Sequence, residues 1–281
     1  MSINRRHILG AAAAATGLAA CSPQPVATTD CSGDLQTAPL TFLLIHGTWH
    51  GGWVWKYVRQ HLEDQGHRVF TPTLTGCGER EHLSSPDVGL DTHIQDIVNV
   101  IEYENLRDIF ISAHSFSGVA MTGAVDRLRD RITHVNFFDA LVPREGRMSA
   151  VERDPDGGLP EYFLERRKNF PDGYKMVFEA DYPLEMLLPV QHPRAGWVRS
   201  KLSTHPARTW TDTLTLANGG WEGLPRSYIH CVGQEFAKSS EKMIGPARGE
   251  GWNFIELEIP RNGMVTDPEP VARTFLRLAV K

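Results

Sequence analysis

Short apolar segments alternate with helix-like segments along most of this chain, and the alternation limits the folds open to it. The first apolar run, residues 40–45, has the nearly continuous apolar pattern of a strand buried on both faces. Further strands are predicted at residues 68–71, 108–112, 134–138, 228–232 and 253–257. Helices are predicted at 54–65, 91–104, 118–129 and 268–280, with Asp91 capping the second. This pattern predicts an α/β fold, a mainly parallel sheet flanked by helices.

One long segment breaks the alternation. Residues from 144 to about 218 carry proline, glycine and scattered aromatic residues without a clear strand. We expect this segment to form a mostly helical cap over the carboxyl ends of the strands. The chain has 281 residues, of which 41% are hydrophobic, enough for one large core. Residues 40–281 are therefore predicted to form a single domain with a cap at about 144–218.

The first 39 residues have the composition of a targeting segment followed by a flexible tether. Arg5 and Arg6 precede a small, apolar stretch that is too short to span a bilayer. The paired arginines resemble a twin-arginine export signal, and residues 18–21 (Leu-Ala-Ala-Cys) resemble a bacterial lipobox. We expect an export signal at 1–20, a lipidated Cys21 and a flexible tether at 21–39. The expected product is an exported bacterial protein on the periplasmic side, touching the membrane only through Cys21. The alternative is a plain signal peptide with an incidental cysteine.

Composition excludes several classes of partner. The formal net charge of −5 gives no electrostatic footprint for nucleic acid. Four cysteines cannot form a dense disulfide framework, and none has zinc-ligand spacing. Cys77 and Cys231 are expected to be buried free thiols, with a single disulfide as the alternative. The sequence implies no metal and no organic cofactor, and it sets no oligomeric state. The expected partner is a small-molecule substrate or ligand.

A serine lies between a predicted strand and a predicted helix at residues 110–118, Phe-Ile-Ser-Ala-His-Ser-Phe-Ser-Gly. This segment has the form of a nucleophile elbow, with Ala113 and Ser117 where glycines are usual. Such a sharp turn needs small residues, and it raises the Ser115 hydroxyl above the sheet. The helix that follows favours negative charge at its amino end. The pattern indicates that Ser115 is a catalytic nucleophile.

The loop after the first strand, residues 46–53, combines glycines with tryptophans. Its backbone can direct the Thr48 amide to the same point as the Phe116 amide, which would form an oxyanion hole. Trp49 and Trp53, together with Trp55, are candidates for the walls of an apolar substrate pocket.

Taken together, these segments resemble the α/β-hydrolase superfamily, in particular the esterase and hydroxynitrile-lyase-like branch that includes plant methylesterases. The resemblance runs from about residue 40 to the end of the chain. It rests on His46-Gly47, His50-Gly51-Gly52-Trp53, residues 73–80, residues 90–94, Ala113-His114-Ser115 and residues 138–143. It implies an α/β-hydrolase fold with a helical cap, Ser115 as nucleophile, and the Thr48 and Phe116 amides as oxyanion donors.

The same resemblance implies a degenerate triad, because this fold takes its acid and then its histidine from later loops. The acid position falls on Gln234, with Glu235 next to it as a possible substitute acid. The base position falls on Gly263 by the plant-like pattern, or on Arg261 by a bacterial one. The chain has twelve histidines, but none follows His230. Neither glycine nor arginine can act as a base at neutral pH.

Other residues are open to these roles. His50, in the oxyanion loop, is a possible substitute base, and His114 and His205 are weaker candidates. His230 lies in a predicted strand, where we expect it to be packed. Arg261 could bind a substrate carboxylate or form a salt bridge with an acid such as Glu235. For Gly263 the alternative is a tight turn.

Two functions follow. The first is weak or unconventional hydrolysis of a small apolar ester, amide or lactone by an esterase-like pocket that keeps its serine and oxyanion hole. Loss of a triad removes about four to six orders of magnitude in rate, so efficient ester hydrolysis is not expected. The alternative is a non-catalytic, ligand-binding pseudo-hydrolase. Lyase-type proton transfer also needs a base and meets the same objection.

Overall fold

Six parallel strands form the centre of the fold. The computed structural model describes residues 38–145, 148–233, 241 and 243–280. The sheet has the order β2-β1-β3-β4-β7-β8, and every described pairing in it is parallel. Its strands are β1 (Thr41–Ile45), β2 (Arg68–Phe70), β3 (Ile109–His114), β4 (Ile132–Phe138), β7 (Arg226–Cys231) and β8 (Asn253–Leu257). The predicted mainly parallel sheet is confirmed.

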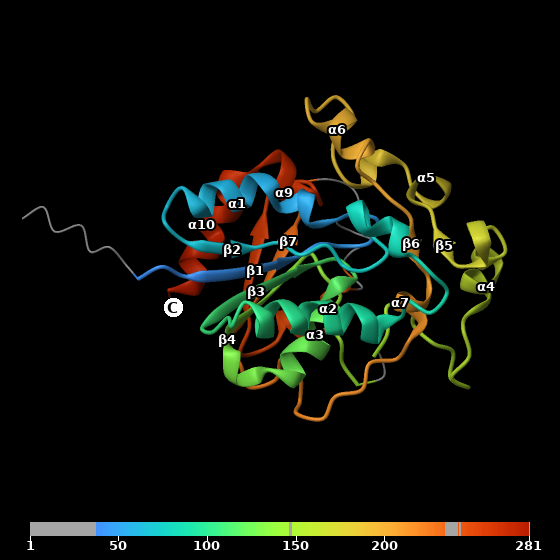
Figure 1. Cartoon of the computed structure of the whole chain (residues 1–281), viewed down its shortest axis with the longest axis horizontal. Coiled ribbons are helices and arrows are strands. Elements are labelled where there is room, and N and C mark those ends of the chain that lie inside the picture. Colours follow the sequence, from blue (N-terminus) through green and yellow to red (C-terminus); the bar gives the residue numbers. More distant parts are fainter. Residues whose placement is uncertain (1–37, 146–147, 234–240, 242, 281) are drawn as a thin grey trace, which may run out of the picture. The chain divides into compact units, whose positions relative to one another are not determined.

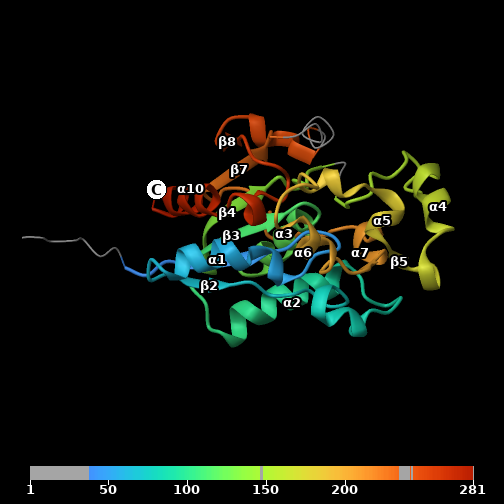
Figure 2. The same cartoon turned by 90° about the horizontal axis from the view of Figure 1, so that it is seen from above.

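Helices cover both faces of the sheet (Figures 1 and 2). They are α1 (Lys56–Glu63), α2 (Leu90–Tyr103), α3 (Ser117–Arg127), α9 (Gly263–Thr266) and α10 (Pro268–Ala279). Side chains of a strand alternate between faces, so Phe42 and Leu44 join the hydrophobic cluster under α1 and α10. Leu43 and Ile45 join the cluster under α2 and α3. Both faces are buried, which explains the continuous apolar run at 40–45.

One detail of the helix prediction is wrong. Helix α2 begins at Leu90, and Gly89 is its N-cap residue. The side chain of Thr92 accepts a hydrogen bond from the Gly89 amide. Asp91 therefore lies in the first turn, where its carboxylate pairs with Arg127 of α3. An acid in the first turn still favours the helix, but through the helix dipole rather than as a cap.

The cap follows β4 and precedes β7, and it lies beyond the carboxyl ends of the strands (Figures 1 and 2). Its elements are α4 (Glu161–Arg167), β5 (Lys175–Met176), α5 (Phe178–Asp181), α6 (Ala195–Arg199), β6 (His205–Pro206) and α7 (Arg208–Thr211). Strands β5 and β6 pair as an antiparallel ribbon, which the sequence pattern did not predict. Phe163, Met176 and Phe178 belong to the same hydrophobic cluster as Phe42 of the sheet. The cap is therefore packed onto the core.

The two cysteines of the described domain are buried free thiols, as predicted. Burial raises the pKa of both the Cys77 and the Cys231 thiols, which keeps them protonated. None of the helices in the described ranges is both long enough and apolar enough to cross a membrane. The predicted export signal, Cys21 and the tether as far as residue 37 lie outside the described residues.

Candidate active site

Ser115 occupies a strained turn between β3 and α3. Its φ of +60° is a left-handed conformation that a residue with a side chain rarely adopts. The turn is fixed by the Leu141 amide, which donates to the Ser115 carbonyl at 2.9 Å. A Cβ on Gly118 would lie 2.1 Å from the Leu141 carbonyl oxygen, so only glycine fits there. This close approach locks the elbow and raises the Ser115 side chain above the sheet.

The oxyanion loop passes directly against the elbow. A Cβ on Gly47 would lie 2.9 Å from the Ser115 Cβ and 2.7 Å from His114 Nδ1. Within the described part of the chain, neither the Thr48 amide nor the Phe116 amide has a hydrogen-bond acceptor. Two amides without acceptors beside a nucleophile are the donors that an oxyanion requires.

Two tryptophan indoles hold the oxyanion loop to the cap. Trp210 of α7 donates to Thr48 Oγ1 at 3.1 Å. Trp49, whose φ is +63°, donates to the Met176 carbonyl at 3.2 Å. The loop that supplies the Thr48 amide is therefore positioned by cap residues, and its geometry depends on the cap.

Above Ser115 lies a cavity of about 150 Å³ whose walls are mostly apolar. It is lined by Trp49, Ser115, Phe116, Leu141, Ala150, Phe178, Tyr182, Met186, Leu187, Trp210, Met243 and Arg261. Trp53 and Trp55, which the sequence also offered as pocket walls, are not among the residues that line this cavity. Trp53 packs against His50 and Trp197, with ring centroids 5.3 and 5.2 Å apart. Trp55 is fully buried in the core. The cavity suits a small apolar molecule.

Arg261 is the charged residue that lies against the nucleophile. It follows β8, and its Nη2 donates to Ser115 Oγ at 2.8 Å. Its Nη1 donates to Asp139 Oδ2 in a buried ion pair. Arg261 is only 6% exposed and Asp139 only 1%, so water screens this pair weakly. A guanidinium at this position stabilises a negative charge on Ser115 Oγ but cannot accept its proton.

Asp139 and His230 are site residues that sequence reasoning missed. Asp139 follows β4 in a left-handed conformation, with φ of +44°. His230 of β7 donates from Nδ1 to Asp139 Oδ1 at 3.1 Å, while its Nε2 lies 3.7 Å from Glu241 Oε2. The sequence predicted a packed His230 but did not indicate its hydrogen bond to Asp139. A carboxylate directly after a strand that neighbours the nucleophile strand was the available signal, because parallel strands end at one edge.

The two candidate base positions differ in geometry. Gly263 is the buried first residue of α9, and a Cβ there would lie 2.3 Å from Ile259 Cδ1. Arg261, by contrast, is in hydrogen-bond contact with Ser115. The structure thus brings the position implied by the bacterial pattern to the nucleophile.

His50 has other partners than the nucleophile. Its Nδ1 lies 2.7 Å from the Thr48 carbonyl, which can only accept, so Nδ1 carries the proton. Its Nε2 accepts from Asn262 Nδ2 at 3.0 Å. Burial lowers the pKa of His50 to about 3, which keeps the ring neutral. His50 therefore acts as a support for the oxyanion loop, and the geometry does not favour it as the base.

The other two histidine candidates are also buried. His114 has no hydrogen-bond partner for either ring nitrogen within the described residues, and burial together with nearby Arg261 lowers its pKa well below the usual range. His205 lies between Cys77 Sγ at 3.2 Å and Thr209 Oγ1 at 2.9 Å. Burial likewise lowers its pKa well below the usual range. In the described structure neither ring is hydrogen-bonded to Ser115.

The predicted acid position, Gln234, and the substitute acid, Glu235, lie outside the described residues. Among the residues that are described, no group of three or more histidine, cysteine, aspartate or glutamate side chains is arranged to hold a metal ion.

The parallel sheet, the strained serine turn and the two free amides define an esterase-like α/β hydrolase. The chain belongs to the alpha/beta hydrolase family, whose model matches residues 42–274.

Similar proteins agree with this assignment. The carbendazim hydrolyzing esterase of Nocardioides sp. (strain SG-4G) is 32% identical over 84% of this chain and 98% of its own length. Methylesterase 1 of Arabidopsis thaliana is 24% identical over 85% of this chain and 96% of its own length. The fold is also that of an extracellular alpha/beta-hydrolase from a Paenibacillus species, at TM-score 0.69 and 22% identity, covering 85% of this chain and 99% of that one.

Proposed function

We propose that this protein is a slow serine esterase that acts on small apolar esters, amides or lactones, with Arg261 assisting Ser115 in place of a histidine base. The observation that carries the proposal is the 2.8 Å hydrogen bond from Arg261 Nη2 to Ser115 Oγ at the base of an apolar cavity. Relatives named as esterases support the reaction class.

Acylation is the step that this geometry assists. A cation within hydrogen-bond distance favours the ionised form of a hydroxyl, so Arg261 favours the Ser115 alkoxide. The serine proton passes to hydroxide in solvent, the alkoxide oxygen bonds to the carbonyl carbon, and the oxyanion forms against the Thr48 and Phe116 amides. The carbon–oxygen bond to the leaving group then breaks, and the group departs as an alkoxide with the electron pair and takes a proton from water.

The leaving group decides which esters react. A histidine-based enzyme protonates the departing alkoxide with its imidazolium, whereas the guanidinium of Arg261 holds its protons too tightly to donate them usefully. Alcohols that leave readily as anions, such as phenols and enols, are therefore the favoured leaving groups. Simple alkyl esters and amides are expected to react more slowly.

Deacylation is expected to limit turnover. The incoming water needs a base, and no histidine follows His230 in the sequence. The acyl group on Ser115 is then released mainly by attack of hydroxide. The kinetic signature is a burst of product close to one equivalent of protein, followed by a slow steady rate.

A second candidate function, ligand binding without turnover, is favoured by one observation. Arg261 is already paired with Asp139 and also donates to Ser115, so the polar groups at the cavity base satisfy one another. A pocket of that kind can hold a small apolar molecule with no chemical step.

The deciding experiment uses the purified domain, a fluorophosphonate probe and p-nitrophenyl acetate. We expect stoichiometric labelling and a burst of p-nitrophenol in the native protein, and neither in Ser115→Ala. Ser200→Ala, which alters an exposed cap serine, is the matched control and should behave as the native protein. Equal traces in the native and Ser115→Ala proteins would exclude serine catalysis and leave the binding function.

We further propose that the protein is exported and lipid-anchored through Cys21. The support is the sequence of residues 1–21. Expression of the full chain with labelled palmitate should give a membrane-associated, labelled protein. Cys21→Ala should abolish the label, and a labelled Cys21→Ala protein would contradict the anchor.

A further inference from the structure

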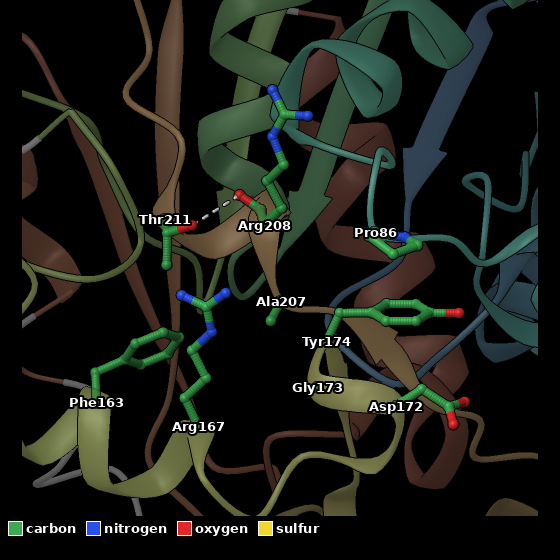
Figure 3. Close-up of a pocket in the computed structure, with 9 residues that line it drawn as sticks. All are labelled: Pro86, Phe163, Arg167, Asp172, Gly173, Tyr174, Ala207, Arg208 and Thr211. Carbon is green, nitrogen blue, oxygen red and sulfur yellow. Dashed lines mark hydrogen bonds between the residues drawn. The ribbon is translucent and has the colours of Figure 1, made fainter.

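A second cavity, larger than the active cavity, lies in the cap beside α7. It has a volume of about 310 Å³ (Figure 3). Its lining residues are Pro86, Phe163, Arg167, Asp172, Gly173, Tyr174, Ala207, Arg208 and Thr211. None of them lines the cavity above Ser115. Helix α7 is common to both, since Trp210 lines the active cavity and Thr211 the cap cavity.

One uncompensated positive charge points into this cavity. Figure 3 shows the Arg167 guanidinium between Phe163 and Ala207, and it has no ion-pair partner within the described residues. The Arg208 side chain turns away from the centre, and its Nε lies 3.2 Å from Asp212 Oδ1. Asp172 is neutralised by Lys175, at 2.7 Å. Among the described lining residues, Arg167 is therefore the charge that no acid pairs with, and it favours an anionic ligand.

Two aromatic residues set the shape of the cavity. Tyr174 lines one side, and its hydroxyl donates to the Ser84 carbonyl at 3.1 Å, which fixes the ring. Phe163 lies on the other side of the Arg167 guanidinium and is fully buried (Figure 3). Because Phe163 lies behind the Arg167 guanidinium without exposed surface, the Tyr174 ring is the flat face that a ligand can contact. A flat ring beside a single guanidinium fork matches a flat apolar molecule that carries one carboxylate.

The walls of the cap cavity are continuous in sequence with residues that hydrogen-bond to the oxyanion loop. Tyr174 precedes β5, and the Met176 carbonyl of β5 accepts the Trp49 indole at 3.2 Å. Ala207 precedes α7, whose Trp210 donates to Thr48 Oγ1 at 3.1 Å. The Ala207 amide donates to the Tyr174 carbonyl at 2.8 Å, so the two walls are bonded to each other.

We propose that the cap cavity is a binding site for a small aromatic carboxylate, and that its occupation accelerates acylation of Ser115. A ligand that bridges Arg167 and Tyr174 favours the arrangement in which both walls, Tyr174 and Ala207, are in place. That same arrangement holds Thr48 and Trp49 in position, so binding shifts the population toward the formed oxyanion loop. The kinetic part rests on the proposed function, whereas the binding part does not.

Binding is tested with benzoate by calorimetry, using benzamide as the uncharged analogue. We expect saturable benzoate binding, no comparable benzamide binding, and affinity weakened about tenfold or more in Arg167→Ala, as loss of a charged hydrogen bond predicts. Lys168→Ala removes the adjacent exposed cation and should leave affinity unchanged. Binding that persists in Arg167→Ala, or that benzamide matches, would overturn the site.

The location and the coupling are tested separately. Protein whose Ser115 is blocked by a fluorophosphonate should still bind benzoate, and loss of binding there would place the ligand in the active cavity instead. Saturating benzoate should raise the burst rate with p-nitrophenyl acetate several-fold in the native protein and not in Arg167→Ala. Binding without any change in burst rate would overturn the coupling. A protein with no burst under any condition contradicts the proposed function and leaves the binding result standing.

Discussion

The nucleophile half of the site, residues 46–53 and 112–118, depends mainly on backbone geometry, whereas the base half depends on charged side chains. In the first half, Gly47 and Gly118 permit contacts that no other residue would allow. In the second half, Arg261, Asp139 and His230 form a chain of charged and polar groups that ends on Ser115.

The difference shows which parts of a serine-hydrolase site can be exchanged independently. A turn made by tight backbone packing fails if a glycine gains a side chain, so its residues are restricted by sterics. A side-chain network can change its chemistry as long as buried charges stay paired. Arg261 and Asp139 satisfy that condition, although a guanidinium cannot accept a proton from Ser115.

The largest effect is expected from placing a histidine in the charged half. Arg261→His places an imidazole beside Ser115 with Asp139 already present as an orienting carboxylate. We expect the steady rate after the burst to rise about 10²–10⁴-fold, the usual contribution of a general base. The measurement is p-nitrophenyl acetate turnover, for Arg261→His alone and with Gln234→Asp.

The matched control is Gly263→His, alone and with Gln234→Asp. Its Cβ would lie 2.3 Å from Ile259 Cδ1, so the Ile259 side chain must move to admit it. No gain is expected, because Arg261 and not residue 263 is in hydrogen-bond contact with Ser115. A larger gain from Gly263→His than from Arg261→His would show that residue 263, and not 261, is the base position.

The second effect concerns stability. Arg261→Met leaves the Asp139 carboxylate buried without its cation, which costs about 3–5 kcal/mol in the free energy of unfolding. Adding Asp139→Asn should recover part of that loss. Urea denaturation measures both, and Arg59→Met, which breaks an exposed pair with Glu63, should cost less than about 1 kcal/mol. Equal losses for Arg261→Met and Arg59→Met would contradict a structural role for the buried pair.

The third effect is the dependence of labelling on pH. A histidine base gives a rate that rises through its pKa and then levels. Here burial lowers the pKa of His50 to about 3. Its ring is therefore neutral throughout the pH range of the experiment and adds no inflection to the curve of labelling rate against pH. The serine proton must go to hydroxide, and the labelling rate should rise about tenfold per pH unit between about pH 6 and 9. A plateau above about pH 7 would reveal a titrating base near the ordinary histidine pKa.

The smallest effect is expected from removing one hydrogen bond between the cap and the oxyanion loop. Trp210→Phe keeps an aromatic wall but removes the indole that donates to Thr48 Oγ1. Loss of one hydrogen bond, about 1 kcal/mol, should slow acylation roughly fivefold. Burst kinetics measure it, and Trp197→Phe, whose ring packs on Trp53 outside the cavity, is the control. No difference between these variants would show that the oxyanion loop does not need the cap.

The backbone-built half of the site could be predicted from the sequence because its signals are local. The Ser115 elbow lies between a buried strand and a helix, and the glycine-rich loop follows the first strand. The strand and helix positions were also predictable, since burial on both faces leaves a continuous apolar run. The β5–β6 ribbon was not, because strands of two residues carry no periodicity.

The arrangement of the charged half could not be predicted from the sequence, because Asp139, His230 and Arg261 come from separate loops and strands. Asp139 and Arg261 are more than a hundred residues apart and meet only where the carboxyl ends of β4 and β8 reach the same edge of the sheet. Trp53 and Trp55 looked equivalent to Trp49 in composition. Burial against the core and the Trp197 contact separate them, and neither is visible in a linear pattern.

By itself, the sequence determined the parallel α/β sheet, the serine elbow and the absence of any histidine after residue 230. These are properties of local pattern and of chain order. Only the tertiary structure decided that Arg261 takes the place beside Ser115, that Asp139 and His230 support it, and that the cap holds the oxyanion loop. The physical reason is that a buried charge must find its partner in three dimensions, and sequence separation sets no limit on which residue that partner is.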